Sequence, residues 1–168
     1  LKNLEWKHKN NKFLYYIKAL TRELLPSAFF RTKLLEKLAS VSNFDAAYIK
    51  ERVNYYNKLS VTTPLSADAI HLSELKIPKK QKVYYFDSYE FTRYFDRNLK
   101  AKFLFGDITR VPIEPSIVKS RPLQENNANS IVLKLDKVRH FTYTKDKKEF
   151  LKKKDLLIWR GVVKREHR

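Results

Sequence analysis

The stretch that decides the fold is VYYFDSYEFTRYFDRNLKAKFLF, residues 83–105. It opens with the β-prone run 83–86, continues with a helical pattern over 88–97 and returns to a β-prone run at 102–105. A strand, a helix and a strand in succession are typical of an α/β unit. We therefore predict an α/β fold, in which this stretch begins a Rossmann-like half-domain that covers residues 76–168.

The sequence on either side of this stretch extends the prediction. Two further β-prone runs lie at 131–135 and 156–159, and the charged stretch 146–154 is expected to form the helix before the last run. Residues 1–60 are expected to form a basic amphipathic helical arm. The chain begins without Met and stops just after the last β-prone run, so we expect a fragment of a longer protein.

The expected helical arm carries apolar residues at helical spacing and a break near Pro26. The apolar positions are Phe13, Leu14, Ile17, Leu20 and Leu24. Lys and Arg interleave with them, a composition suited to a helix that lies in a lipid headgroup layer. The commoner explanation is a helical pair that packs on its own domain and leaves a basic face in solvent.

The charge of the chain is its most pronounced bulk property. It has 36 Lys and Arg against 18 Asp and Glu, for a formal net charge of +18. A surface of this charge attracts anionic partners, and three kinds fit: nucleic acid, an acidic membrane face, and phosphorylated small molecules or glycolipids. Net charge alone does not choose among these partners.

Several classes of site are excluded by composition and spacing. Cysteine is absent, so the chain has no disulfide, zinc–thiolate site or cysteine nucleophile. No His or carboxylate spacing of the zinc type occurs, and neither a Walker loop nor a Gly-x-Gly-x-x-Gly fingerprint is present. We therefore expect no metal site. The chain also lacks an apolar stretch of the roughly 18 to 20 residues that a spanning helix needs.

Polar residues that follow the β-prone runs are the first candidates for a site, because ligands of α/β sheets bind beyond the carboxyl ends of strands. Asp107 follows the run 102–105 and could accept a proton from an attacking hydroxyl. Taken alone, it is more often a turn or cap residue. Arg160 and Gly161 follow the last run and could bind a phosphate, although a strand-end Arg-Gly pair is also common in purely structural roles.

A third candidate group lies between these two. Lys119 and Arg121 lie within the segment 118–122, and Asn129 belongs to the amide-rich segment 126–130. Two cations and a run of amides suit a hydroxyl-rich or phosphorylated ligand. The simpler alternative is a solvated loop of ordinary turn residues.

These segments together resemble the lipopolysaccharide-modifying glycosyltransferases, which are related to the eukaryotic protein O-glucosyltransferases. The resemblance covers about residues 48–168, and its order of blocks is more specific than any single block. The blocks are FGDITRVP at 105–112, VKSRP at 118–122, NSIVLKLDKVRHF at 129–141, KKDLLIWRG at 153–161 and HR at 167–168.

The resemblance implies a two-lobed glycosyltransferase of the GT-B type, of which this chain would be the first lobe. Such an enzyme transfers a hexose from a nucleotide sugar, here expected to be a UDP-hexose, to a lipopolysaccharide or lipooligosaccharide core. The transfer is expected to invert the anomeric carbon without a catalytic metal or other cofactor. The expected location is the cytoplasmic side of the inner membrane, with peripheral attachment through the basic arm.

The resemblance also assigns roles to individual residues. Asp107 matches the catalytic base of the family, although Gly106 stands where the eukaryotic relatives have an arginine. The donor-binding block falls at 155–168, and Val162 replaces a serine of the eukaryotic relatives within it. The residues expected to bind the donor are Trp159, Arg160, Gly161 and Arg168. Those expected to contact the acceptor or a phosphate are Lys119, Arg121 and Asn129.

The main alternative is a basic nucleic-acid-binding module, supported by the net charge and the many aromatic residues. The aromatic residues lie mostly at apolar-periodic positions and not in an exposed stacking ladder, and no RNP, helix-turn-helix or KH signature occurs. The residues alone leave the two interpretations nearly level. With the resemblance, we expect nucleotide sugar, anionic glycolipid and membrane surface as partners, and no nucleic acid.

Overall fold

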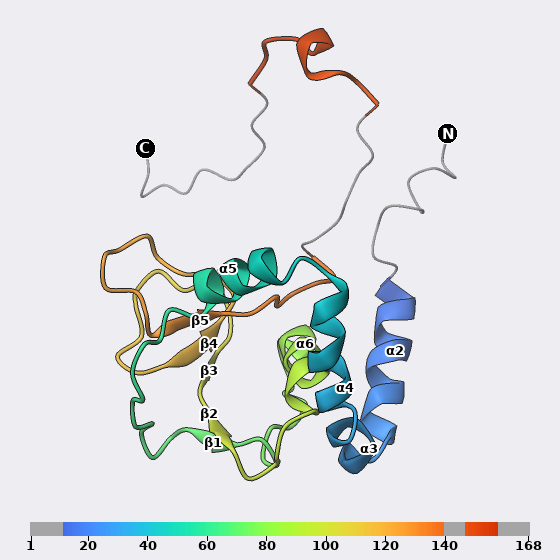
Figure 1. Ribbon diagram of the computed structural model, residues 1–168, viewed down its shortest axis with the longest axis vertical. Helices are drawn as coiled ribbons and strands as arrows, with labels where there is room; N and C mark the ends of the chain where they lie inside the picture. The colour runs from blue at the N-terminus through green and yellow to red at the C-terminus, as the bar shows by residue number, and fades with distance from the viewer. Residues whose placement is uncertain (1–11, 140–146, 158–168) are drawn as a thin grey trace.

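The computed structural model describes residues 12–139 and 147–157 (Figure 1). It is a mixed α/β structure, with helices in the N-terminal third and a small parallel sheet later in the chain. The helices are α2 (Lys12–Leu24), α3 (Ser27–Arg31), α4 (Leu34–Ala39), α5 (Ala46–Tyr56) and α6 (Lys82–Thr92), with the 3-10 turns η1 (Ser40–Asn43) and η2 (Phe150–Lys152).

The N-terminal helices begin and end where local chemistry requires. The predicted break near Pro26 is confirmed, because this proline separates α2 from α3 and stands at the N-cap of α3. The N-cap of α5 is Asp45, whose Oδ1 accepts a hydrogen bond of 2.9 Å from the backbone N–H of Tyr48. None of the helices in the described residues combines the length and apolar character that crossing a membrane requires.

Helix α6 corrects the prediction of a strand at 83–86. These residues form the first half of the helix, which ends at Thr92 and not at 97. Aromatic residues in α6 are buried on several sides, including Tyr84, Tyr85 and Phe86. The sequence of a helix that is surrounded by protein has a continuous apolar run instead of apolar residues on one side only. Periodicity cannot distinguish such a run from the sequence of a buried strand.

The parallel sheet has the strand order β3-β4-β5 and is built from three short strands. They are β3 (Phe103–Leu104), β4 (Ser116–Val118) and β5 (Ser130–Val132). The predicted runs at 102–105 and 131–135 therefore contain strands. A separate antiparallel pair joins β1 (Ile70–His71) to β2 (Lys100–Ala101).

The connections within the sheet differ from the Rossmann-like alternation that we predicted. Residues 105–115 and 119–129 join the parallel strands without a helix. Within the stretch 146–154, the described residues form only η2. Leu156 and Leu157 lie outside any strand, and residues 158–159 of that predicted run are not among the described residues.

The core forms where α2 packs on α6. Ala19 is buried with Phe86 and Tyr89, and the half-buried Tyr15 and Tyr16 pack against this cluster. The apolar stripe predicted on α2 is exposed: its five residues are 42–83% exposed, namely Phe13, Leu14, Ile17, Leu20 and Leu24. The helix thus packs on its own domain, as the commoner explanation requires, but through a different face from the predicted stripe.

A buried carboxylate joins three segments of this core. Asp87 of α6 has no exposed surface. Its Oδ1 accepts a hydrogen bond of 2.8 Å from the Tyr15 hydroxyl of α2, and its Oδ2 accepts one of 2.9 Å from the backbone N–H of Lys137, beyond β5. Burial raises the pKa of Asp87 and outweighs the lowering by these two hydrogen bonds.

Candidate functional site

The predicted candidates Asp107 and Lys119 meet at one edge of the parallel sheet. Leu104 of β3 is paired with Val118 of β4, so the two strands end side by side. Lys119 follows β4 directly and Asp107 lies three residues beyond β3. The Nζ of Lys119 is 2.5 Å from Oδ1 of Asp107. The geometry therefore brings together two residues that are twelve positions apart.

The two side chains of this ion pair differ in their exposure to solvent. The Asp107 side chain is 77% exposed, whereas that of Lys119 is only 12% exposed. The hydrogen bond to Asp107 raises the pKa of Lys119, and this effect outweighs the lowering caused by burial. Lys119 consequently remains a cation that holds an accessible carboxylate in place.

The turn that presents Asp107 depends on a glycine. Gly106 has a φ of +105°, a backbone conformation that residues with a Cβ rarely adopt. On the far side of the turn, the Ile108 N–H donates a 3.4 Å hydrogen bond to the Ser120 hydroxyl. The loops after β3 and β4 are thus joined by both an ion pair and a hydrogen bond.

Two aromatic side chains near this pair were not predicted as part of a site. The Tyr84 ring lies 5.9 Å from the Nζ of Lys119 and 5.2 Å from the Phe105 ring. Because we predicted Tyr84 to lie in a strand, its approach to the sheet edge from α6 was missed. Its spacing of seven residues from Phe91 is a helical signal that could have found it.

The other two predicted contact residues point to structural partners. Arg121 donates hydrogen bonds to the backbone carbonyls of Tyr55, at 2.6 Å, and Tyr56, at 3.5 Å, at the end of α5. Asn129 donates to the carbonyls of Pro112 and Ile113, at 3.2 and 2.7 Å, just before β5 begins. Asn129 therefore lies at the amino end of its strand, at the opposite edge from Asp107.

The predicted donor-binding residues Trp159, Arg160, Gly161 and Arg168 lie outside the described residues. Within the described part of the chain, no three His, Cys, Asp or Glu residues gather closely enough to hold a metal ion.

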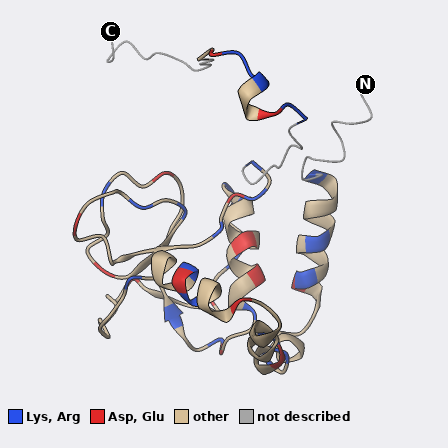
Figure 2. Ribbon diagram, turned by 45° about the horizontal axis from the view of Figure 1, so that its top comes forward, with Lys and Arg blue, Asp and Glu red and all other residues tan. Residues whose placement is uncertain are grey.

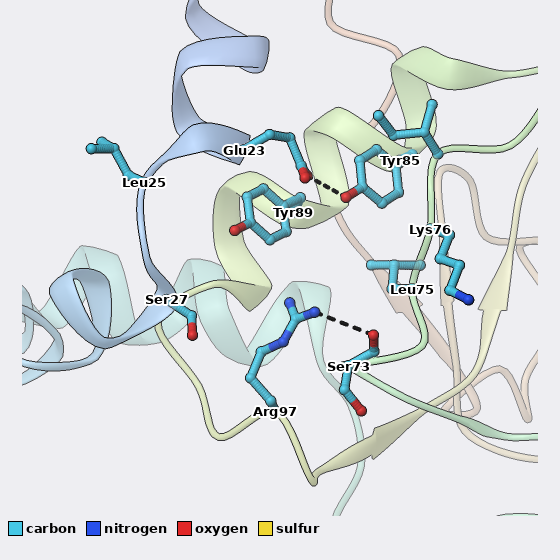
Figure 3. A pocket seen from close by; sticks show the side chains of 10 residues that line it. Glu23, Leu25, Ser27, Ser73, Leu75, Lys76, Tyr85, Tyr89 and Arg97 are labelled. Atoms are coloured by element: carbon cyan, nitrogen blue, oxygen red, sulfur yellow. Dashed lines mark hydrogen bonds between the residues drawn. The ribbon is translucent and has the colours of Figure 1, made fainter.

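A hollow of about 550 Å³ lies beside another face of α6 (Figure 3). Its wall includes Tyr85 and Tyr89, whose rings are stacked with centroids 6.0 Å apart. The Tyr85 hydroxyl donates to Glu23, and Arg97 donates to the carbonyl of Ser73 at 3.3 Å. No residue predicted from the sequence lies in this hollow.

The comparison with known proteins confirms the class that the sequence blocks indicated. The chain is similar to a glycosyltransferase of the class that these blocks resemble. The relative that supports this is the O-glucosyltransferase LpsA of Dichelobacter nodosus, which is 37% identical over 161 residues. The match covers 94% of this chain and 50% of LpsA, so the chain spans about half the length of the curated relative it matches. No protein-family model and no solved structure matches the chain.

Proposed function

We propose that this chain is the first lobe of a GT-B type glycosyltransferase that transfers a hexose from a nucleotide sugar to a lipopolysaccharide or lipooligosaccharide core. The observation that carries the proposal is the 37% identity to an O-glucosyltransferase over nearly the whole chain. The carboxylate at the carboxyl edge of the parallel sheet supports it, because this is where α/β sheets bind their ligands.

The chemistry proposed for the site is a single displacement at the anomeric carbon. The acceptor hydroxyl gives its proton to the Asp107 carboxylate as its oxygen bonds to the anomeric carbon. The bond from that carbon to the nucleotide phosphate breaks, and the configuration inverts. Lys119 orients Asp107 from 2.5 Å away. Charge that develops on the departing nucleotide is held by Arg160, Arg168 and backbone N–H groups, without a metal.

The binding roles proposed for the remaining residues follow from their positions. Lys119 is the favoured contact for an anionic acceptor, because it already lies beside Asp107. The side chain of Arg121 is engaged with α5, and Asn129 lies at the far edge of the sheet. These two residues support the proposal less directly. Trp159 and Gly161 are proposed to contact the donor together with the two arginines.

The test is a transfer assay with the complete two-lobed enzyme, UDP-glucose and a lipid-linked core acceptor. We expect a glycosylated product and release of UDP in equal amounts, without added metal. The competing nucleic-acid module predicts neither. It predicts instead a salt-sensitive electrophoretic shift of random single strands, and that result in the absence of nucleotide-sugar binding would overturn the proposal.

We also propose that α2 attaches the protein to the anionic cytoplasmic face of the inner membrane. Its exposed stripe consists of Phe13, Leu14, Ile17, Leu20 and Leu24, and Lys and Arg lie along the same helix (Figure 2). An apolar stripe flanked by cations gains free energy both from burial among acyl chains and from attraction to anionic headgroups. The stripe is not used in packing against α6, so it remains accessible.

Sedimentation with vesicles measures this attachment. We expect the protein to sediment with vesicles that contain anionic lipid and to remain in solution with neutral vesicles. Replacing both Leu20 and Leu24 with Gln should lower the vesicle-binding constant by about a hundredfold or more, because each exposed leucine contributes roughly 1.5–3 kcal/mol when fully buried and each 1.4 kcal/mol is a factor of about ten. The matched control is Ile113→Gln, at a fully exposed residue far from α2 in sequence. Equal binding to both kinds of vesicle would contradict the proposal.

A further inference from the structure

An unusual cation lies at the C-terminal end of α6. Arg93 caps this helix and is only 8% exposed. Its guanidinium carbon lies 4.3 Å from the centroid of the Phe30 ring of α3, and its Nη2 donates a 2.9 Å hydrogen bond to the Tyr94 hydroxyl. The other two nitrogens, Nε and Nη1, are buried and have no hydrogen-bond partner. Buried polar N–H groups without a partner carry a large desolvation cost, so this edge of the guanidinium lacks an acceptor.

A hollow adjoins this residue. It has a volume of about 320 Å³ and is lined by Arg93 together with Lys37, Glu90, Phe91, Tyr94 and Phe95. Lys37 of α4 is exposed, and its Nζ lies 5.3 Å from the same Tyr94 ring that Arg93 approaches at 4.9 Å. Two cations thus approach one ring in the wall of the hollow.

The neighbouring carboxylate, Glu90, is shared among several cations. Oε2 of Glu90 is 2.9 Å from a nitrogen of Arg22 and 2.8 Å from the Nζ of Lys137. Against the effect of burial, Lys137, Arg22 and, to a smaller degree, Arg93 lower the pKa of Glu90, so one carboxylate is shared by three cations. Arg93 and Lys37 add two positive charges beside this group, and no salt bridge of either is found among the described residues.

We propose that this hollow binds a phosphate monoester, held by Arg93 and Lys37. A dianion matches the two cations in charge, and its three terminal oxygens offer acceptors to the unpaired Nε and Nη1 and to the Lys37 ammonium. The side chains that cover the two nitrogens move to admit the ligand, and the exposed Lys37 follows it. The site lies apart from Asp107 and goes beyond sugar transfer, so it stands even if the transfer assay fails.

The experiment follows the Nε–Hε signal of Arg93 by NMR in the full chain labelled with ¹⁵N-arginine. Inorganic phosphate is titrated at constant ionic strength, and the signal is assigned by its loss in Arg93→Lys. We expect this signal to shift in a saturable manner. Lys37→Ala should weaken binding by about tenfold, the effect of one charge-assisted hydrogen bond. Lys33→Ala is the matched control: Lys33 is also an exposed cation over a ring, that of Phe29, and should leave the affinity unchanged.

Two outcomes would overturn the proposal: an Arg93 signal that does not move while other arginine signals do, or an equal loss of affinity in Lys37→Ala and Lys33→Ala. Lys37 is exposed, so its variant tests the site even if replacement of Arg93 prevents folding. Vesicles of phosphatidylcholine with or without phosphatidic acid then identify the source of the phosphate. Sedimentation that depends on phosphatidic acid and on Lys37 indicates a lipid headgroup. Binding of inorganic phosphate alone indicates a soluble ligand, and either result supports the site.

Discussion

Asp107→Asn in the complete enzyme is expected to lower the turnover number by about 10² to 10⁴, the typical contribution of a general base. The amide keeps the size and planar shape of the carboxylate but cannot take the proton of the acceptor hydroxyl. The side chain is 77% exposed, so the substitution should leave the fold intact. The measurement is steady-state release of UDP with saturating donor and acceptor.

The control for this substitution is Asp96→Asn. Asp96 is also exposed, and its Oδ1 accepts a backbone hydrogen bond of 2.8 Å from Asn98, which an amide oxygen can accept equally. It lies in the loop after α6, away from the sheet edge. Turnover should be unchanged in this control. Near-normal turnover in Asp107→Asn would remove Asp107 from the proposed mechanism.

Asp87→Ala is expected to lower the free energy of unfolding by about 2–4 kcal/mol, because it removes the acceptor of two hydrogen bonds in the core. The backbone N–H of Lys137 loses its acceptor, and the Tyr15 hydroxyl keeps only its longer hydrogen bond of 3.2 Å to the carbonyl of Val83. The variant therefore weakens the junction of α2, α6 and the segment beyond β5. Urea unfolding followed by circular dichroism measures the change. An unchanged unfolding midpoint would show that this junction does not stabilise the fold.

Tyr15→Phe separates the two contacts of Asp87, because it removes the hydroxyl and keeps the ring. Its expected cost is about 1 kcal/mol, and Tyr16→Phe, which leaves the Asp87 contacts in place, is the matched control. Because Tyr15 and Asp87 touch, the effects of Tyr15→Phe and Asp87→Ala should not add, and a double-mutant cycle measures their coupling.

The contribution of Asp87 to the free energy of unfolding should also depend on pH. Burial raises the pKa of Asp87 in the folded chain, so the folded state holds this proton more tightly than the unfolded state. The contribution of Asp87 to stability is therefore greatest below its unfolded pKa of about 3.9 and falls as the pH rises through the folded pKa. The groups around it, Tyr15, Lys137 and Glu90, remain in Asp87→Ala. The difference in free energy of unfolding between wild type and Asp87→Ala should accordingly become smaller as the pH rises from the unfolded pKa through the folded pKa of Asp87.

The sequence alone determined the features that depend on short-range chemistry. Pro26 breaks the first helix because proline cannot continue it, and the β-prone runs around 103–104 and 131–132 contain strands. The position of Asp107 just beyond a strand could also be predicted, since a glycine and an aspartate after an apolar run mark its end. The resemblance to lipopolysaccharide-modifying glycosyltransferases depends on the order of several such blocks.

The tertiary structure decided the features that depend on which surfaces meet. Residues 83–86 belong to a helix because burial on several sides removes the one-sided pattern that distinguishes helix from strand. The face of α2 that packs against the core consists of Ala19, Tyr15 and Tyr16. The more apolar stripe of the helix is not part of this packed face. Lys119 meets Asp107 only because β3 and β4 pair in parallel. The unpaired nitrogens of Arg93 are buried because Phe30 of α3 packs against the end of α6. Contacts of this kind join residues distant in sequence, so no local propensity encodes them.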